Sequence, residues 1–598
     1  MNDDSASHQK QTTIPLPPIL PILPLPDIPP QELDRTAHTQ LARFTYGVSP
    51  AALGGAYMDW LIHLSLSPGK QYELLEKAIE KSQRIAAHAL RGPFDHCKPC
   101  IEPLPQDRRF TQPEWQEWPF NLIYQSFLLT QQWWHNATTE VPGVTAHHEE
   151  VVTFANRQLL DMVSPSNYLL TNPEVQAVTL KSGGNNLLEG GKNLVHEALR
   201  LAANQPLPGT EKFRPGKEVA LTPGKVVFRN HLIELIQYSP QTDTVCAEPV
   251  LIVPSWIMKF YILDLSPENS LVRYLVEKGQ TVFMLSWRNP GASDRNLGMD
   301  DYLKSGVMAA IDAVTAIVPK QKIQALGYCL GGTLLGIAAA YMARRHDERL
   351  KTLTLLASEL DFEDPGELGL FIDESQLSFL NDAMARKGYL DGKQMAGAFA
   401  LLNSRDLVWS RMVHDYLLGG KHPVTDLTAW NLDATRMPYR QHSEYLRSLY
   451  LKNDLAEGHY RVDGKPIALS DIQIPIFALG TQHDTVSPWH AVYKIHLLIS
   501  GDMTFCLTSG GHNVGVVNPP SHGLKRSYQI ATRKAGTHYT DPETWLASHP
   551  KHEGSWWPAL THWLQRHSSE QTAPPAMGNA AGGYPTLDNA PGRYVLVP

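Results

Sequence analysis

The sequence predicts an α/β domain built on a mostly parallel sheet, preceded by an all-α domain. Residues 31–215 have a helical pattern, with Trp- and Leu-rich runs such as 118–128 spaced to give one apolar face. In residues 216–568, short β-rich runs alternate with helical stretches, which is typical of a parallel sheet. A third observation is Cys329, which has a glycine two residues before it and two after it, between a strand-like run and an Ala-rich helical run.

The composition indicates a large globular enzyme. Of the 598 residues, 42% are hydrophobic and 19% are charged, which is enough for a large core and more than one domain. The net charge of −8 argues against a nucleic-acid-binding surface. Five scattered cysteines argue against a disulfide framework and predict a reducing compartment, the cytoplasm. Since no run of about 18 apolar residues and no signal-peptide pattern occurs, we expect neither a transmembrane segment nor export.

Both ends of the chain are expected to be tails. Residues 1–30 form a Pro-rich segment in which proline alternates with Leu and Ile, which favours extended polyproline II. We predict a disordered linker there, and the alternative is that its apolar residues lie on a partner surface. Residues 569–598 are rich in Ala, Gly and Pro, which predicts a loosely ordered C-terminal tail that residues 594–597 could anchor.

The second domain contains seven predicted strands. They are residues 226–228, 250–253, 281–286, 323–326, 352–356, 474–479 and 503–507. More than a hundred residues of helical pattern separate the fifth strand from the sixth. We expect this insertion, at about residues 362–450 and rich in aromatic residues, to form a cap over the site.

Cys329 is predicted to be a nucleophile on a sharp turn from a strand into a helix. In such a turn, the residues two before and two after the nucleophile must lack a Cβ, and Gly327 and Gly331 fill these places. The N-terminal N–H groups of the following helix would favour a thiolate and later an oxyanion. The alternative is a buried cysteine in a glycine-rich loop, because motifs of this length are common.

Candidates for an acid and a base lie downstream of the cysteine. Asp484 and His512 each occupy a loop that follows a predicted strand. The chain order nucleophile, acid, histidine is that of the α/β-hydrolase fold. His483 is a rival base, but one loop cannot easily supply both the base and the group that orients it. We therefore predict a catalytic triad of Cys329, Asp484 and His512 on an α/β-hydrolase fold with a cap insertion.

An oxyanion hole is predicted from the same topology. One donor is the backbone N–H of Leu330, directly after the nucleophile. The second is the backbone N–H of Trp256 or Ile257, in the loop after strand 250–253, and Ile257 is our choice.

Other motifs give weaker signals. Cys97 and Cys100 have the spacing of a zinc or redox site, but no second pair of ligands lies near them in the sequence. The glycine pairs 183–184 and 190–191 lack the Lys-Ser/Thr of a phosphate loop and are expected to be turns. We predict no cofactor and no bound metal.

Seven motifs in order, within roughly residues 110–598, resemble the class I poly(3-hydroxyalkanoate) synthases. They lie at residues 256–265, 286–290, 327–333, 361–366, 430–433 with Arg436, 509–520 and 554–557. Residues 41–70 also look like a helical segment that precedes some of these synthases. Two features depart from the family pattern: Met258 stands where an asparagine is usual, and residues 405–411 differ from the usual sequence.

The resemblance implies an acyltransferase that polymerises (R)-3-hydroxyacyl-CoA into a polyester and releases CoA. A thiol that attacks a thioester keeps the acyl group energised for transfer to an alcohol. His512 would deprotonate Cys329, and Asp484 would orient His512 or help to activate the 3-hydroxyl group that attacks. Tyr328 and Leu330 match the short-chain type better, which implies 3-hydroxybutyryl-CoA. The implied partners are the growing polyester, the surface of a polyester granule in the cytoplasm and a second copy in a homodimer.

Two other functions stay open from the sequence. A cysteine-dependent hydrolase on the same fold, acting as a thioesterase or polyester depolymerase, would release CoA without making polymer. A non-enzymatic granule-coating module would use the Pro-rich segment for binding, but it leaves three functional residues at three separate loops without a role.

Overall fold

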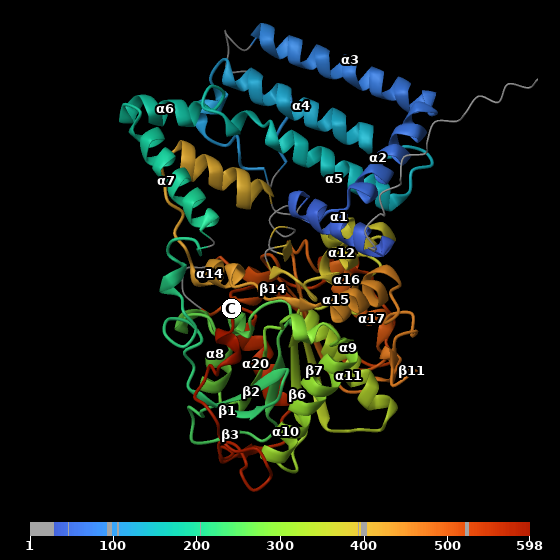
Figure 1. The fold of residues 1–598 in the computed structure, drawn as a ribbon, viewed down its shortest axis with the longest axis vertical. Coiled ribbons are helices and arrows are strands. Elements are labelled where there is room, and N and C mark those ends of the chain that lie inside the picture. The colour runs from blue at the N-terminus through green and yellow to red at the C-terminus, as the bar shows by residue number, and fades with distance from the viewer. Residues whose placement is uncertain are drawn as a thin grey trace, which may run out of the picture.

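The computed structural model of this protein describes residues 29–598, except 46, 92–97, 105–106, 204, 393, 396, 398–403 and 521–524. Nearly all of the Pro-rich segment 1–30, and Cys97, therefore lie outside the described residues. Figure 1 shows helices α3, α4 and α5 at one end of the molecule and the large sheet at the other. Helices α12, α14 and α15 lie between these two parts.

The N-terminal region is helical, as predicted. Its helices are α1 (Pro30–Phe44), α2 (Pro50–Ser65), α3 (Pro68–Arg91), α4 (Phe120–Thr138), α5 (Ala146–Met162), α6 (Pro173–Ser182) and α7 (Asn185–Ala202). The side chains of Ser49, Thr145 and Asn172 accept hydrogen bonds from backbone N–H groups three residues later, which starts α2, α5 and α6. Among the described helices, none is both long and apolar enough to cross a membrane.

The second glycine pair does not form the turn that we expected. Gly183 and Gly184 do join α6 to α7, but Gly190 and Gly191 lie inside α7. A Cβ atom on Gly190 would lie 1.9 Å from the carbonyl oxygen of Tyr416. Gly190 therefore allows the backbone of residue 416 to pack directly on α7.

The main sheet has ten strands in the order β1-β2-β5-β4-β6-β7-β12-β13-β14-β15. The six strands from β5 to β13 in this order are parallel, and the flanking pairs are antiparallel. The strands are β1 (Gly224–Arg229), β2 (Ile233–Tyr238), β4 (Val250–Val253), β5 (Val282–Trp287), β6 (Ile323–Tyr328), β7 (Leu350–Leu356), β12 (Ile476–Thr481), β13 (Met503–Thr508), β14 (Ser527–Arg533) and β15 (His552–Glu553). Each of the seven predicted strands overlaps one of these.

Strands β2 and β14, and the two-residue β15, were not predicted. β2 is fully buried although it contains Glu234, whose carboxylate accepts from the backbone N–H groups of Arg593 and Tyr594 at 2.9 Å. Polar residues inside a buried strand make it hard to recognise from its apolar pattern. Here Glu234 can be buried because a segment distant in the sequence donates hydrogen bonds to its carboxylate. β14 lies near the edge of the sheet and is mostly half-buried, so it lacks a run of apolar residues.

The segment between β7 and β12 contains α12 (Glu374–Ala385), α14 (Asp426–Leu432) and α15 (Tyr439–Tyr445). It also contains three π-helical stretches, η9 (Arg405–Ser410), η10 (Val413–Leu417) and η11 (Leu446–Leu451). Helix α1 packs on α12, where His38 Nδ1 lies 2.7 Å from Asp382 Oδ2. We call residues 362–450 the cap.

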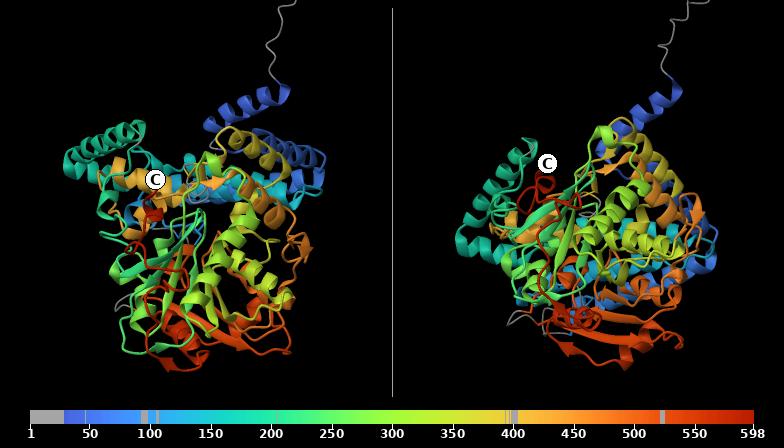
Figure 2. Two further views of the ribbon diagram at one scale, coloured as in Figure 1. Left: turned by 60° about the horizontal axis from the view of Figure 1, so that its bottom comes forward. Right: turned by 90° about the horizontal axis from the view of Figure 1, so that it is seen from below.

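The C-terminal residues 569–598 are not the loosely ordered tail that the composition suggested. β16 (Gln571–Thr572) pairs with β3 (Val245–Cys246), and the backbone N–H of Leu587 donates to Val226 in β1. Figure 2 shows this red segment running beside the green strands. The buried ammonium of Lys259 donates to the carbonyl oxygen of Val595 at 3.0 Å, so the expected anchor near residues 594–597 is present.

Candidate active site

Cys329 lies between β6 and helix α11 (Leu330–Arg344), with φ = 53° and ψ = −133°. A Cβ on Gly327 would lie 2.3 Å from Gly332 Cα, and one on Gly331 would lie 2.3 Å from the carbonyl oxygen of Val253. Both glycines are therefore required for the sharp turn. The thiol is 8% exposed and lies at the positive end of the 15-residue helix.

His512 and Asp484 form a hydrogen-bonded pair beside the thiol. His512 Nδ1 lies 2.8 Å from Asp484 Oδ2. His512 also forms a side-chain hydrogen bond with Cys329, and Nε2 is the ring nitrogen that remains for it. Burial favours the neutral ring, but the charges of Asp484 and Cys329 and the hydrogen bonds to both hold the pKa of His512 well above 6.5.

Asp484 is fixed by further donors. Its Oδ2 accepts from the Thr481 hydroxyl at 2.8 Å, and its Oδ1 accepts from the backbone N–H groups of Val486 and Ser487 at 2.9 Å. Burial acts to raise the pKa of Asp484, but His512 and these donors lower it below its usual 3.8. The carboxylate is thus held ionised and in one orientation.

The rival base lies elsewhere. The side chain of His483 is exposed, and its backbone N–H donates to the carbonyl of Gly510. His512 begins the short helix α18 (His512–Val516), which packs closely on β12, because a Cβ on Gly515 would lie 2.6 Å from Thr481 Cγ2. The geometry therefore brings Cys329, Asp484 and His512 together and leaves His483 outside the group.

The loop after β4 lies beside the thiol, as the register of the strands requires. Val253 in β4 is paired with Gly327 in β6. The backbone N–H of Ile257 faces the hydroxyl of Ser255 at 3.5 Å, which is longer than the roughly 2.7–3.2 Å of a normal N–H···O hydrogen bond. A substrate oxyanion could compete for this weakly held N–H. The roles of Ile257 and Leu330 as oxyanion donors stay predictions.

Glu359 is a buried carboxylic acid near the site that the sequence analysis missed. It follows β7, is 2% exposed, and its Oε1 has no hydrogen-bond partner among the described residues. Burial, and then the charges of Asp484 and Cys329, hold its pKa well above 4.5. The sequence offers no signal for it, because only the fold places this strand end beside Cys329.

A polar chain joins the site to the cap and was also missed. The hydroxyl of Tyr328 donates to Asn513 Oδ1 at 2.6 Å, and Asn513 Nδ2 donates to Asn431 Oδ1 at 3.3 Å. Asn431 belongs to α14, and residue 513 follows the histidine of the triad. The sequence does carry a weak signal for this link, because Tyr328 is adjacent to Cys329 and Asn513 is adjacent to His512.

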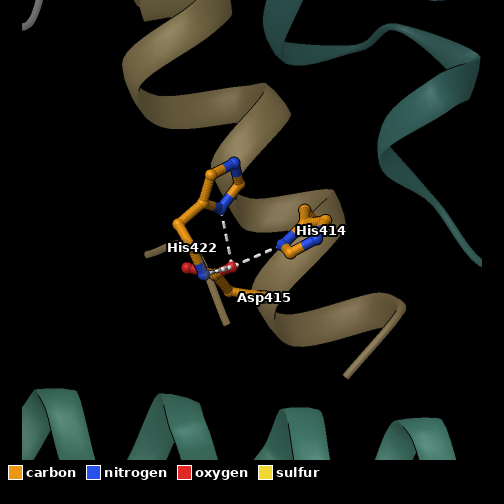
Figure 3. Close-up of side chains that lie close together, drawn as sticks. All are labelled: His414, Asp415 and His422. Carbon is orange, nitrogen blue, oxygen red and sulfur yellow. Dashed lines mark hydrogen bonds and ion pairs between the residues drawn. The ribbon is translucent and has the colours of Figure 1, made fainter. Parts of the chain in front are cut away.

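One group in the described part of the chain could hold a metal ion. The ligand atoms of His414, Asp415 and His422 lie within 4.8 Å of one another (Figure 3). Both Nδ1 atoms already contact Asp415 Oδ1, at 2.7 and 2.8 Å, and Arg411 Nε contacts Asp415 Oδ2 at 3.3 Å. These contacts satisfy the carboxylate without a metal. Cys100 is half-buried, and Cys97, the other cysteine of the zinc- or redox-like spacing, lies outside the described residues.

Comparison with known proteins gives matches over most of the chain. Residues 29–70 match the family described as poly-beta-hydroxybutyrate polymerase N terminal, and residues 106–275 match poly-beta-hydroxybutyrate polymerase (PhaC) N-terminus. Residues 248–519 match the alpha/beta hydrolase fold, which confirms the predicted fold class.

Three curated relatives are similar over most of their own length. The chain is 40% identical to a poly(3-hydroxyalkanoate) polymerase of Methylorubrum extorquens over 83% of this chain and 82% of that one. It is 38% identical to poly(3-hydroxyalkanoate) polymerase subunit PhaC of Rhizobium etli, over 83% and 78%. It is 36% identical to the subunit of the same name from Cupriavidus necator, over 91% of each chain.

Proposed function

This chain belongs to the poly(3-hydroxyalkanoate) polymerases, which are acyltransferases, and we propose that it polymerises (R)-3-hydroxyacyl-CoA through an acyl thioester on Cys329. The observation that carries the proposal is the contact of Cys329 with His512, whose ring is held by Asp484 at 2.8 Å. A thiol that is paired with an oriented imidazole is an activated nucleophile.

In the first step, His512 accepts the thiol proton and the sulfur of Cys329 attacks the carbonyl carbon of the thioester. The backbone N–H groups of Leu330 and Ile257 would hold the resulting oxyanion. When the carbonyl re-forms, the bond to the CoA sulfur breaks, and His512 returns its proton to that sulfur. One thioester has replaced another.

In the second step, a 3-hydroxyl group attacks the acyl thioester. The hydroxyl proton goes to His512, an ester bond forms, and the sulfur of Cys329 leaves as a thiolate. Asp484 stabilises the protonated imidazole by its charge and its hydrogen bond. To activate a hydroxyl group of the substrate, the Asp484 carboxylate would have to give up its hydrogen bonds to His512 and to its other donors. This favours the role of orienting His512.

The proposal extends to the substrate and to the setting in the cell. The side chains of Tyr328 and Leu330 beside the thiol favour a short acyl chain such as 3-hydroxybutyryl. We also propose that the protein is a homodimer and works in the cytoplasm. Its place there would be the surface of polyester granules, because the apolar product separates from water as it grows.

The test follows thiol release and chloroform-soluble polymer with (R)-3-hydroxybutyryl-CoA. In Cys329→Ala, both are expected to fall at least about 1,000-fold, because the covalent step is lost. Cys506→Ala is the matched control, since this thiol is fully buried in β13 and burial raises its pKa. Polymer formation by Cys329→Ala at more than a few per cent of the wild-type rate would exclude the thioester, and CoA release without polymer in the wild type would indicate a hydrolase.

A further inference from the structure

Two adjoining cavities lie between the N-terminal helices and the cap. The first has a volume of about 350 Å³ and is lined mainly by apolar side chains of α2 and α5, among them Ala52, Val151 and Phe154. The second, of about 100 Å³, is lined mostly by residues of the cap. Val48, Phe371 and Gln376 line both cavities, so the two adjoin each other. The first is within the size range of ligand sites, about 300–1,000 Å³.

The second cavity reaches the neighbourhood of the thiol. Tyr445 and Tyr450 line it, with ring centres 5.9 Å apart. Tyr445 also packs edge-on against Trp256, at 5.9 Å, in the loop beside Cys329. Burial, and then the charge of Cys329, raise the pKa of Tyr445, which places this ring near the thiol. Cys329 itself is not among the described residues that line the cavity.

His442 supplies a polar group in this apolar space. It lines the second cavity, is 3% exposed, and neither ring nitrogen has a hydrogen-bond partner among the described residues. Burial lowers the pKa of His442 to about 3, so the ring is neutral and offers one N–H donor and one acceptor. A buried donor without a partner is costly, which indicates that a ligand satisfies it.

We propose that the two cavities hold the growing polyester chain, and that the ring N–H of His442 donates to one of its ester carbonyl groups. The chain leaves the thiol past Tyr445 and Tyr450 and runs toward the space between α2 and α5. This inference rests on the proposed function and adds a binding site for the product.

The chemistry of the lining selects the polyester over the other ligands of the reaction. A polyester has an apolar backbone with carbonyl acceptors, and its single donor is the terminal hydroxyl. CoA carries phosphates that need cations, and no Lys or Arg is among the described residues that line the two cavities. Water is held poorly in a cavity with so few polar groups.

The first test replaces His442 by phenylalanine, a change that removes no hydrogen bond present in the structure. The probe is the methyl ester of the linear trimer of (R)-3-hydroxybutyrate, titrated calorimetrically into Cys329→Ala protein. We expect His442→Phe to weaken binding by about 2- to 10-fold, which is the usual effect of one hydrogen bond. His496→Phe is the matched control, because His496 is also buried, with its pKa lowered to about 4, and lines neither cavity.

The second test fills the first cavity. Ala52 lines it, whereas Ala51, its neighbour in α2, is exposed and does not. With (R)-3-hydroxybutyryl-CoA, we expect Ala52→Phe to leave the first release of CoA unchanged and to shorten the product at least threefold, while Ala51→Phe makes wild-type polymer. Thermal unfolding checks that both variants fold.

The outcomes separate this inference from the proposed function. If wild-type protein makes no polymer, the function is wrong, whatever the trimer does. If wild-type protein makes polymer, and Ala52→Phe and His442→Phe give the same polymer length and trimer affinity as their controls, the chain leaves by another route and the inference is overturned.

Discussion

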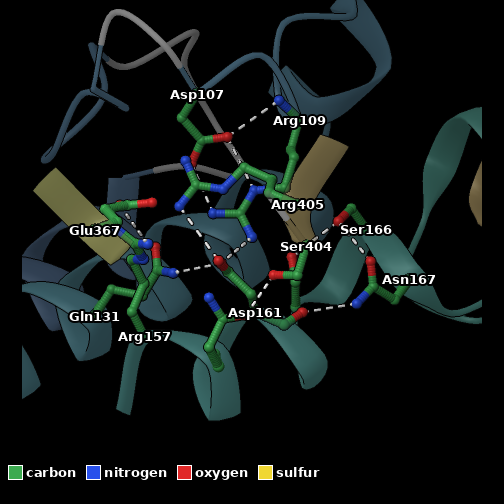
Figure 4. A network of polar contacts seen from close by, with 12 residues as sticks. Asp107, Arg109, Gln131, Arg157, Asp161, Ser166, Asn167, Glu367, Ser404 and Arg405 are labelled. Carbon is green, nitrogen blue, oxygen red and sulfur yellow. Dashed lines mark hydrogen bonds and ion pairs between the residues drawn. The ribbon is translucent and has the colours of Figure 1, made fainter. Parts of the chain in front are cut away.

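Arg405 of the cap donates a hydrogen bond to the carboxylate of Asp161 in α5, at 3.3 Å. The same carboxylate accepts from Arg109 at 2.8 Å and from the amide of Gln131 at 3.2 Å (Figure 4). Asp161 is 2% exposed, and Arg109 in turn binds Asp107. The cap is therefore joined to the N-terminal helices by a buried network of charges.

Removing Asp161 should destabilise the protein strongly. Asp161→Ala removes the carboxylate shared by Arg405 and the buried Arg109, and Arg109 keeps only Asp107 as an ionic partner. The expected loss is at most about 3–5 kcal/mol in the free energy of unfolding. Arg157→Ala is the control in the same region, because its pair with Glu367 at 3.0 Å is only part-buried and is expected to be worth about 0–1 kcal/mol. Urea denaturation measures both. If both variants lose the same free energy of unfolding, the buried network contributes no more than a part-buried ion pair.

Replacing His512 should slow acylation itself. In His512→Gln the thiol loses its base, and the rate of the first CoA release is expected to fall about 100- to 10,000-fold. In Asp484→Asn the ring loses its orienting carboxylate, so acylation should fall as well. Rapid-quench trapping of the acyl enzyme measures this step. If Asp484→Asn acylates normally and only elongation stalls, the carboxylate serves the hydroxyl group instead.

The same pair should stabilise the fold within a defined pH window. The raised pKa of His512 contributes stability that is full below pH 6.5 and is lost as pH rises through the raised value. The lowered pKa of Asp484 contributes stability that is full above pH 3.8 and is lost as pH falls through the lowered value. The difference in unfolding free energy between wild type and Asp484→Asn should therefore be largest between pH 3.8 and 6.5. A difference that does not change with pH would contradict this.

Glu359→Gln should stabilise the protein at high pH. The folded state keeps a proton on Glu359 that the unfolded chain releases above pH 4.5, so wild-type stability falls as pH rises from 4.5 toward the raised pKa. In Glu359→Gln this position does not titrate, so the free energy of unfolding does not fall with pH for this reason. Glu248 is the control with the opposite sign, because hydrogen bonds from Ser568 and Ser569 lower its pKa despite burial. Glu248→Gln should lower the free energy of unfolding above pH 4.5. Urea titrations at pH 4 and pH 8 measure the sign of the change for both variants.

The sequence predicted those parts of the fold that depend on local patterns. Gly327 and Gly331 identify the turn at Cys329 because steric limits on the backbone act within a few residues. The seven predicted strands are short runs rich in apolar and β-branched residues, which is typical of a sheet buried on both faces. β2 was missed, because Glu234 is satisfied by residues more than 350 positions away.

The site could be predicted less completely than the fold. Chain order and loop position indicated Asp484 and His512, and the structure brings both to the thiol. Glu359, His442 and the Asp161 network depend on which distant segments meet, and nothing near them in the sequence reports this. The tail at residues 569–598 misled us, because Ala, Gly and Pro are also suited to an extended segment that is held by backbone hydrogen bonds.

The cap should open more readily than the sheet beneath it. The cap contains two π-helical stretches, and a third begins in it at Leu446 and ends at Leu451. Such stretches are rare and are frequently found at functional sites. Residues of the cap also line the cavities near the thiol. CoA, which is charged, has to enter and leave, while water has to be kept from the acyl thioester, so the site needs a closed state and an open state.

Hydrogen exchange measures this opening directly. Amides of the cap are expected to exchange at least tenfold faster than those of β6 and β7, and to become protected when the trimer methyl ester is bound to Cys329→Ala protein. Asp161→Ala should raise cap exchange further, because it removes the buried link to α5, whereas Arg157→Ala, which removes only the part-buried pair with Glu367, should raise it less. Cap amides that exchange as slowly as the sheet, with or without the trimer, would make the cap a rigid wall and would require access to Cys329 from another side.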